Sequence, residues 1–159
     1  MADFVFNIVK GRVVEYANRV NTNDPTNAVF AWSLWNMTQS DAVNIDLDTI
    51  AAVEASGSNA ELTSGTNANY VRKTLDQTGG ITITVDDTND RTDVDCPDQT
   101  WTALGAGTAI TDAVCHYDSD STGGTDSNNI PMTQHDFAVT PDGSDVTAVI
   151  ATAGFFRAQ

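Results

Sequence analysis

The residues best suited to chemistry in this chain are carboxylates gathered between Val85 and Cys96. This stretch holds the oxygen-bearing side chains Asp86, Asp87, Asn89, Asp90, Asp93 and Asp95. Hard cations such as Ca²⁺ prefer clustered carboxylates, but the spacing lacks the glycine and the terminal glutamate of a helix–loop–helix calcium loop. A second acidic loop with Asp118, Asp120 and Asp126 invites the same hypothesis. We expect solvated turns between strands, and we predict no metal and no cofactor.

The two histidines, His116 and His135, are the next candidates for chemistry. Serine and aspartate are so abundant that a Ser/His/Asp set can be selected by eye, yet no Gly-x-Ser-x-Gly elbow occurs. The glycines follow no phosphate-binding spacing either. We therefore expect histidines satisfied by hydrogen bonds within strands or at a subunit interface, and we predict that the chain is not an enzyme.

The two cysteines, Cys96 and Cys115, lie 19 residues apart. A disulfide is geometrically possible if their segments pair as neighbouring strands. In a reducing compartment, two small buried hydrophobic residues are the favoured interpretation. Two cysteines without a further set of Cys and His ligands do not indicate a zinc site.

The first half of the chain gives mixed signals for secondary structure. Residues 4–19 alternate weakly, which predicts two strands joined near Lys10-Gly11. Residues 28–37 (AVFAWSLWNM) are the most apolar run, and their length fits a buried strand or a short helix. Residues 46–55 are the best helix candidate, capped by Asp46 or Asp48 and ended by Ser56-Gly57.

From Tyr70 onward, the pattern predicts β-structure throughout. We expect strands at 70–75, 81–85, 92–95, 99–104, 110–117, 135–140 and 145–150. Short strands at this spacing, separated by Asn/Asp/Gly turns, favour a sandwich or barrel. The predicted fold is a single mainly β domain over 1–159, an antiparallel β-sandwich or barrel-like domain with an extended N-terminal segment and one short helix. Its parts are an arm with strands at 1–27, a variable insertion at 28–68 and a β core at 69–159.

The net charge of -15 restricts the partners of the chain, and 19 of its 22 acidic residues are aspartate. A field of this sign disfavours nucleic acid and anionic membranes. The charge is uneven, since residues 1–22 carry Lys10, Arg12 and Arg19 and have a net charge of +1. These cations either dock onto an acidic or mixed partner surface or serve as local solubilising charges. No targeting segment or membrane-spanning run is visible, so we expect a protein made in a cytoplasm.

Several motifs of the chain resemble a family of small structural proteins of tailed bacteriophages. The matching segments are Tyr70–Leu75, Val85–Arg91, Asp98–Trp101, Ala103–Thr108, Tyr117–Asp126 and Phe156–Ala158. The resemblance covers roughly residues 69–159 and the opening MADFVFNIVKGRVVEY, and the central block 28–66 departs most. It implies a virion protein, namely a capsid cement or decoration protein on the outer capsid surface, assembled in the bacterial cytoplasm. It implies no catalytic residues.

The expected partner is the phage major capsid protein, and the expected state is a homo-oligomer, either a trimer or a dimer, without nucleic acid or membrane. Tryptophan, phenylalanine and arginine dominate buried contacts between proteins. The predicted contact residues are Lys10, Arg12, Arg19, Trp32, Trp35, Phe155, Phe156 and Arg157. For both aromatic groups, a role in the core is the alternative. Two other functions stay open, a tail-tube or neck subunit and a Ca²⁺-dependent carbohydrate-binding module.

Overall fold

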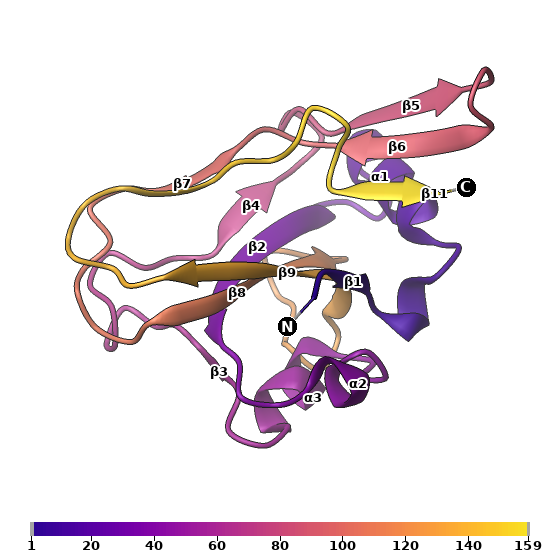
Figure 1. Cartoon of the computed structure of the whole chain (residues 1–159). Coiled ribbons are helices and arrows are strands. Elements are labelled where there is room, and N and C mark those ends of the chain that lie inside the picture. The colour runs from indigo at the N-terminus through magenta and orange to yellow at the C-terminus, as the bar shows by residue number, and fades with distance from the viewer. Residues whose placement is uncertain (1, 159) are drawn as a thin grey trace.

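The computed structural model describes residues 2–158 and shows a mainly β protein built from antiparallel sheets, as predicted. The main sheet has the order β1-β9-β8-β2-β3, and β4 also pairs with β2. Its strands are β1 (Phe4–Val5), β2 (Val29–Asn36), β3 (Ala60–Glu61), β4 (Lys73–Leu75), β8 (Ile110–Asp118) and β9 (Ile130–Val139). Figure 1 shows β2, β8 and β9 crossing the middle of the molecule.

Two smaller sheets extend the body. One pairs β7 (Gln99–Trp101) with β10 (Val146–Ala148). The other has the order β11-β6-β5, formed by β5 (Thr82–Asp86), β6 (Arg91–Asp95) and β11 (Phe156–Ala158). The β5–β6 hairpin projects from one end of the molecule, and the C-terminal strand β11 lies along it (Figure 1). Each strand expected after Tyr70 overlaps one of the observed strands, so this part of the prediction is confirmed.

The predicted pair of strands over residues 4–19 is wrong beyond β1. A 3-10 turn (Asn7–Val9) follows β1, and then α1 covers Val13–Thr22. The helix buries Val13, Tyr16, Ala17 and Val20, which follow the i, i+3, i+4, i+7 spacing of one helical face. The buried face contacts the body, and Tyr16 packs on Tyr117 of β8 with ring centroids 4.6 Å apart. The segment expected as part of an N-terminal arm therefore lies against the β-structure.

The apolar run 28–37 forms the strand β2, which lies between β8 on one side and β3 and β4 on the other. Both faces of the strand are covered, which explains why its sequence does not alternate. Trp32 and Trp35 are 1% and 0% exposed. The block expected as a variable insertion thus supplies a central strand of the main sheet.

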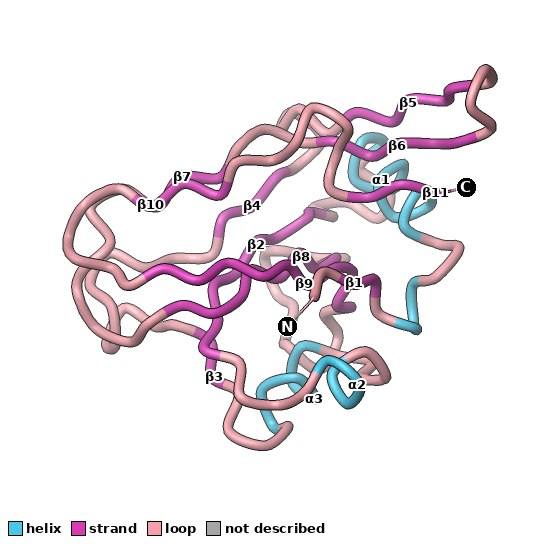
Figure 2. Tube along the Cα trace, in the orientation of Figure 1, coloured by secondary structure: helices cyan, strands magenta, loops and turns pink. Residues whose placement is uncertain are grey.

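The two short helices α2 and α3 lie side by side at the bottom of the view, away from the β5–β6 hairpin, whereas α1 lies beside β6 (Figure 2). Helix α2 (Asp41–Asn44) was not predicted, and α3 (Ile50–Ala55) is shorter than the expected 46–55 helix. The cap is Thr49 rather than Asp46 or Asp48, because the Thr49 hydroxyl accepts a 3.1 Å hydrogen bond from the Ala52 N–H. The helix ends at Ser56, as predicted.

Candidate interaction site

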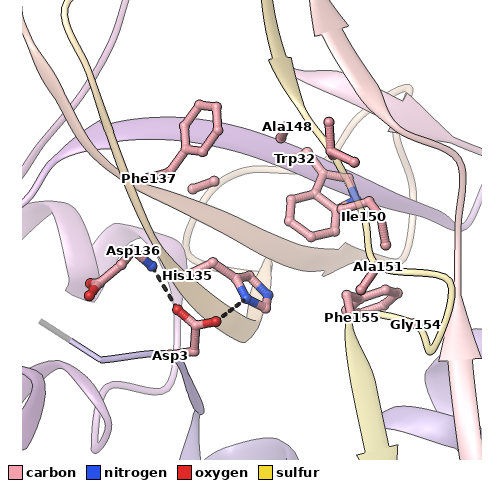
Figure 3. A pocket seen from close by; sticks show the side chains of 12 residues that line it. Asp3, Trp32, His135, Asp136, Phe137, Ala148, Ile150, Ala151, Gly154 and Phe155 are labelled. Atoms are coloured by element: carbon pink, nitrogen blue, oxygen red, sulfur yellow. Dashed lines mark hydrogen bonds and ion pairs between the residues drawn. The ribbon is translucent and has the colours of Figure 1, made fainter.

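A pocket of about 290 Å³ opens where the N-terminal segment, β2, β9 and the segment after β10 meet. We call it the Asp3 pocket, and its lining residues are Asp3, Trp32, Ala113, His135, Asp136, Phe137, Ala148, Val149, Ile150, Ala151, Gly154 and Phe155. Figure 3 shows the labelled side chains around it, with Asp3 and His135 facing each other below Trp32. The pocket unites segments that lie more than a hundred residues apart in the chain, so the sequence alone did not reveal it.

Aromatic rings form much of the pocket wall. The indole of Trp32 stacks on the His135 ring with centroids 5.7 Å apart and meets the Phe155 ring edge-on at 5.4 Å. Phe155 also packs edge-on against Phe30, at 6.0 Å. Perpendicular and offset contacts of this kind are the favoured geometries for aromatic pairs. The wall is therefore set by ring packing within the core.

Gly154 explains how Phe155 reaches this position. The φ angle of Gly154 is +85°, and a Cβ atom there would lie 2.2 Å from the Val94 carbonyl oxygen. Only glycine tolerates both the left-handed backbone and the close approach to β6. The turn is closed by the Gly154 N–H on the Ala151 carbonyl (2.7 Å), and the Phe155 N–H then bonds the Val94 carbonyl (3.1 Å).

Asp3 forms the polar side of the pocket. Its Oδ1 accepts a 2.9 Å hydrogen bond from the Asp136 N–H, and its Oδ2 lies 3.4 Å from Nδ1 of His135. The other ring nitrogen of His135 lies 2.9 Å from the Thr133 hydroxyl. Because side chains alternate along a strand, His135 and Phe137 point into the pocket while the Asp136 side chain turns away (Figure 3). Asp3 thus contributes a carboxylate that is held in place and still 65% exposed.

The predicted contact residues separate into buried and accessible groups. Trp32 and Trp35 belong to the core of the chain, so the prediction that they contact a partner is wrong, and the core alternative is correct. Strand β2 is covered on both faces, which leaves neither indole available as a surface anchor. Phe155 and Phe156 are half-buried and Arg157 is exposed, so these three remain surface candidates.

The cations of the N-terminal segment lie on the solvent side of α1 or just before it. Arg12 and Arg19 are both ion-paired with Glu15, at 3.2 and 3.0 Å, and Arg12 also lies over the Tyr16 ring. The hydrogen bond from Arg12 lowers the pKa of Glu15. Lys10 is exposed in the turn before the helix. This region therefore carries three cations and the carboxylate of Glu15, which binds two of them.

An ion-pair network that sequence reasoning missed joins β3, the residues before β4 and the acidic loop 118–129. The Arg72 guanidinium binds the carboxylate of Glu61 through Nε (2.8 Å) and Nη2, and that of Asp126 through Nη1 (2.6 Å) and Nη2 (2.9 Å). The Tyr70 hydroxyl donates to Glu61 (2.7 Å) and accepts from the Leu34 N–H (3.1 Å). Hydrogen bonding from Arg72 lowers the pKa of Asp126, and burial raises that of Tyr70.

His116 lies buried beside this network. Burial, followed by the charge of Arg72, lowers its pKa to about 3, so the ring is neutral at physiological pH. Within residues 2–158 its Nδ1 has no hydrogen-bond partner. The expectation that strand hydrogen bonds satisfy both histidines therefore fails at this atom, whereas His135 bonds through both nitrogens.

The first acidic loop forms a turn between β5 and β6, as predicted, and the carboxylates of Asp86 and Asp93 are engaged in hydrogen bonds or ion pairs there. Asp86 accepts hydrogen bonds from the N–H groups of Thr88 and Asn89 and an ion pair from Arg91 (3.1 Å). Asp93 pairs with Arg157 at 2.7 Å. Among the residues that the structure describes, no group of three or more Asp, Glu, His or Cys side chains is placed to hold a metal ion.

Both cysteines carry free, buried thiols, which confirms the favoured interpretation. Cys96 follows β6 in the projecting sheet, whereas Cys115 lies in the middle of β8. The two thiols nevertheless lie in the same core cluster, and Cys96 is close enough to contribute to raising the pKa of Cys115.

Comparison with known proteins gives no relatives: no family model, no curated protein and no solved structure matches this chain. Within residues 2–158, no helix has the length and apolar character needed to cross a membrane.

Proposed function

We propose that this chain is a non-enzymatic structural protein of a tailed bacteriophage virion, a capsid cement or decoration protein that binds the outer surface of the major capsid protein lattice. The motif resemblance described above motivates this proposal. What supports it in the structure is the role of the motif residues, because they bind one another and hold the β body together.

The Arg72 network is the observation that carries the proposal. Tyr70 and Arg72 belong to one motif of the resemblance, and Asp126 belongs to another that begins more than forty residues later. In the structure the two motifs meet through paired Arg72–Asp126 hydrogen bonds. Charged side chains that bind one another in this way fit a scaffold that must stay rigid, because they are engaged in mutual bonds and not in a reactive site.

The C-terminal motif, Phe156–Ala158, also binds other parts of the chain, in this case within the sheet β11-β6-β5. Phe156–Ala158 form β11, which pairs with β6, and Arg157 reaches Asp93 beside the Asp86–Arg91 turn. The result is a braced hairpin with an acidic tip that projects from the body (Figure 1).

A cement protein acts by mass action. A protein that binds the assembled lattice and not the free subunits shifts the equilibrium toward the shell, by an amount set by its concentration and its affinity. The acidic surface keeps free copies apart, because like net charges repel. The proposed docking face includes Lys10, Arg12 and Arg19 on the α1 side together with Phe155–Arg157, and the bound state is a homo-oligomer on a local symmetry axis.

Cryo-electron microscopy of virions that contain this chain tests the proposal. The expected result is density for the chain outside the shell at repeated symmetry positions, with hundreds of copies per particle. Density in stacked rings below the portal would overturn it in favour of the tail-tube alternative. Stripping the protein from the shell should also lower the temperature at which heads release their DNA.

Charge reversal tests the docking face. Lys10→Glu should reduce occupancy of stripped shells, because Lys10 is an exposed cation at the proposed contact. Lys73→Glu is the matched control, since it makes the same charge change in β4. Equal occupancy for the two variants and the unmodified protein would remove Lys10 from the docking face.

A further inference from the structure

The Asp3 pocket combines the features that proteins use to bind a cation on an apolar stem. We infer that it receives an arginine or lysine side chain from a partner protein. That this partner is the capsid lattice rests on the function proposed above, whereas the binding chemistry of the pocket stands on the geometry alone.

The aromatic wall suits the charged group of such a side chain. Ring faces carry partial negative charge and attract a guanidinium or ammonium within about 6 Å of the ring centroid. Phe155 is the accessible ring of this kind, since it is half-buried, and it packs against the buried indole of Trp32 at 5.4 Å, as His135 does at 5.7 Å. Because the rings are fixed before binding, little side-chain entropy is lost when a cation enters.

The carboxylate of Asp3 gives the pocket its charge preference. It accepts from the Asp136 backbone and contacts His135, and a carboxylate has about four lone-pair sites, so it retains capacity for an incoming N–H donor. The chain as a whole carries a net charge of -15, which attracts cationic groups to this opening and repels anions.

The remaining wall suits an aliphatic stem. Ala148, Ile150 and Ala151 line the side across from Asp3, and arginine and lysine bury their methylene groups along such surfaces while the charged head binds a carboxylate. The volume of about 290 Å³ lies at the lower end of the range for ligand pockets, which fits one side chain better than a folded segment.

A titration of the isolated full chain tests the pocket directly. The probes are N-acetyl-arginine methylamide, its lysine counterpart and the neutral citrulline counterpart, followed by ¹H–¹⁵N spectra of the Trp32 indole and the backbone near His135. We expect saturable shifts with the two cationic probes and none with citrulline. Equal binding of citrulline, or no saturable shift with either cation up to about 50 mM, the range of very weak ligands, overturns the inference.

Two variants locate the binding. Asp3→Asn keeps an oxygen that can accept from the Asp136 N–H, and it should weaken arginine binding roughly tenfold, because a charge-assisted hydrogen bond is lost. Ala151→Phe fills the pocket from its exposed rim and should abolish the shifts. Ser144→Phe, in the exposed turn before β10, is a control of equal bulk and should bind as the unmodified protein does. Unchanged binding by both pocket variants would place the cation elsewhere.

Occupancy of stripped capsid shells separates this inference from the proposed function. If the unmodified protein binds shells and Ala151→Phe does not, both hold. If both proteins bind equally, the pocket is not the lattice contact and the decoration role survives. If the unmodified protein binds no shell while the arginine titration succeeds, the pocket stands and the decoration role fails.

Discussion

At the scale of single residues, Arg72 is the most connected cation of the chain. Its guanidinium bridges two carboxylates that lie 11 and 54 residues away in the sequence. Removing one partner of a shielded ion pair leaves the others desolvated and unpaired, which costs more than the pair itself contributes. The network therefore couples β3 and the acidic loop 118–129 to the strand region around Tyr70.

Replacing Arg72 by methionine should lower the free energy of unfolding by about 3 kcal/mol, because Glu61 and Asp126 lose their shared counter-ion. Arg72→Lys keeps the charge but cannot form paired bonds to both carboxylates, so it should recover only part of the loss. Urea denaturation followed by tryptophan fluorescence measures both variants. A loss below about 0.5 kcal/mol for Arg72→Met, typical of an exposed pair, would contradict this account.

His116 should make stability depend on pH. Its folded pKa is about 3 and its unfolded value is about 6.5, so the unfolded chain binds more protons between these limits. Stability therefore falls as the pH falls from about 6.5 toward 3, by up to about 1.4 kcal/mol per pH unit.

His116→Gln should flatten this slope between about pH 6 and 4.5, where the ordinary aspartate value of about 3.9 has not been reached. Asp112 acts in the opposite sense, because burial raises its pKa, but it is present in both proteins and cancels in the difference. Urea unfolding across this range measures the two slopes. Parallel slopes would show that His116 does not titrate on unfolding.

The residue contacts were the hardest part to foresee from the sequence. A single sequence does not indicate that Arg72 meets Asp126 or that Asp3 meets His135, because these pairs depend on the folded arrangement of distant segments. A signal did exist for the network, since Tyr70, Arg72 and Asp126 all lie in the motifs of the phage resemblance. For the Asp3 pocket no comparable pattern was present.

At the scale of secondary-structure elements, α1 shows why one region was predicted wrongly. The pairs Phe4/Phe6 and Val13/Val14 suggested alternation, yet the spacing of Val13, Tyr16, Ala17 and Val20 is helical. The acidic turns after Tyr70 were easier to predict from the sequence, because Asn, Asp and Gly favour turn conformations for a defined stereochemical reason. Periodicity could not show whether residues 28–37 form a strand or a helix, since the sequence of a strand covered on both faces resembles that of a buried helix.

The end of α1 offers a test of this element. Asn23 adopts φ 53°, a left-handed conformation, and its side-chain oxygen accepts from the Asn27 N–H at 2.8 Å. Asn23→Ala should destabilise the protein by about 1–2 kcal/mol, because alanine is strained there and the side-chain bond is lost. Asn23→Gly relieves the strain and should cost less. Thermal unfolding by circular dichroism compares them, and a greater loss for glycine than for alanine would contradict the assignment.

At the scale of the whole molecule, the net charge of -15 opposes compaction. Salt shortens the range of this repulsion, from about 30 Å at 0.01 M to about 8 Å at 0.15 M ionic strength. We expect the urea concentration at the unfolding midpoint to rise between these two ionic strengths. Salt screens the repulsion between surface charges more than it screens the ion pairs of the half-buried Arg72 network. Asp87→Asn, which removes one negative charge, should make this rise of the midpoint smaller. A midpoint that falls with salt would show that exposed ion pairs dominate instead.

The reactivity of the two buried thiols, Cys96 and Cys115, measures how often the folded protein opens. Thiol reagents attack the thiolate, and burial raises the pKa of Cys96 to about 12 and that of Cys115 well above its usual value, so neither reacts while enclosed. Labelling of either thiol therefore measures how often the shared core opens, and labelling of Cys96, which directly follows β6, also requires movement at the end of that strand. Protein attached to a lattice that clamps the β11 side should label more slowly at Cys96, because β11 pairs with β6, so this labelling rate is a footprint of attachment obtained without imaging.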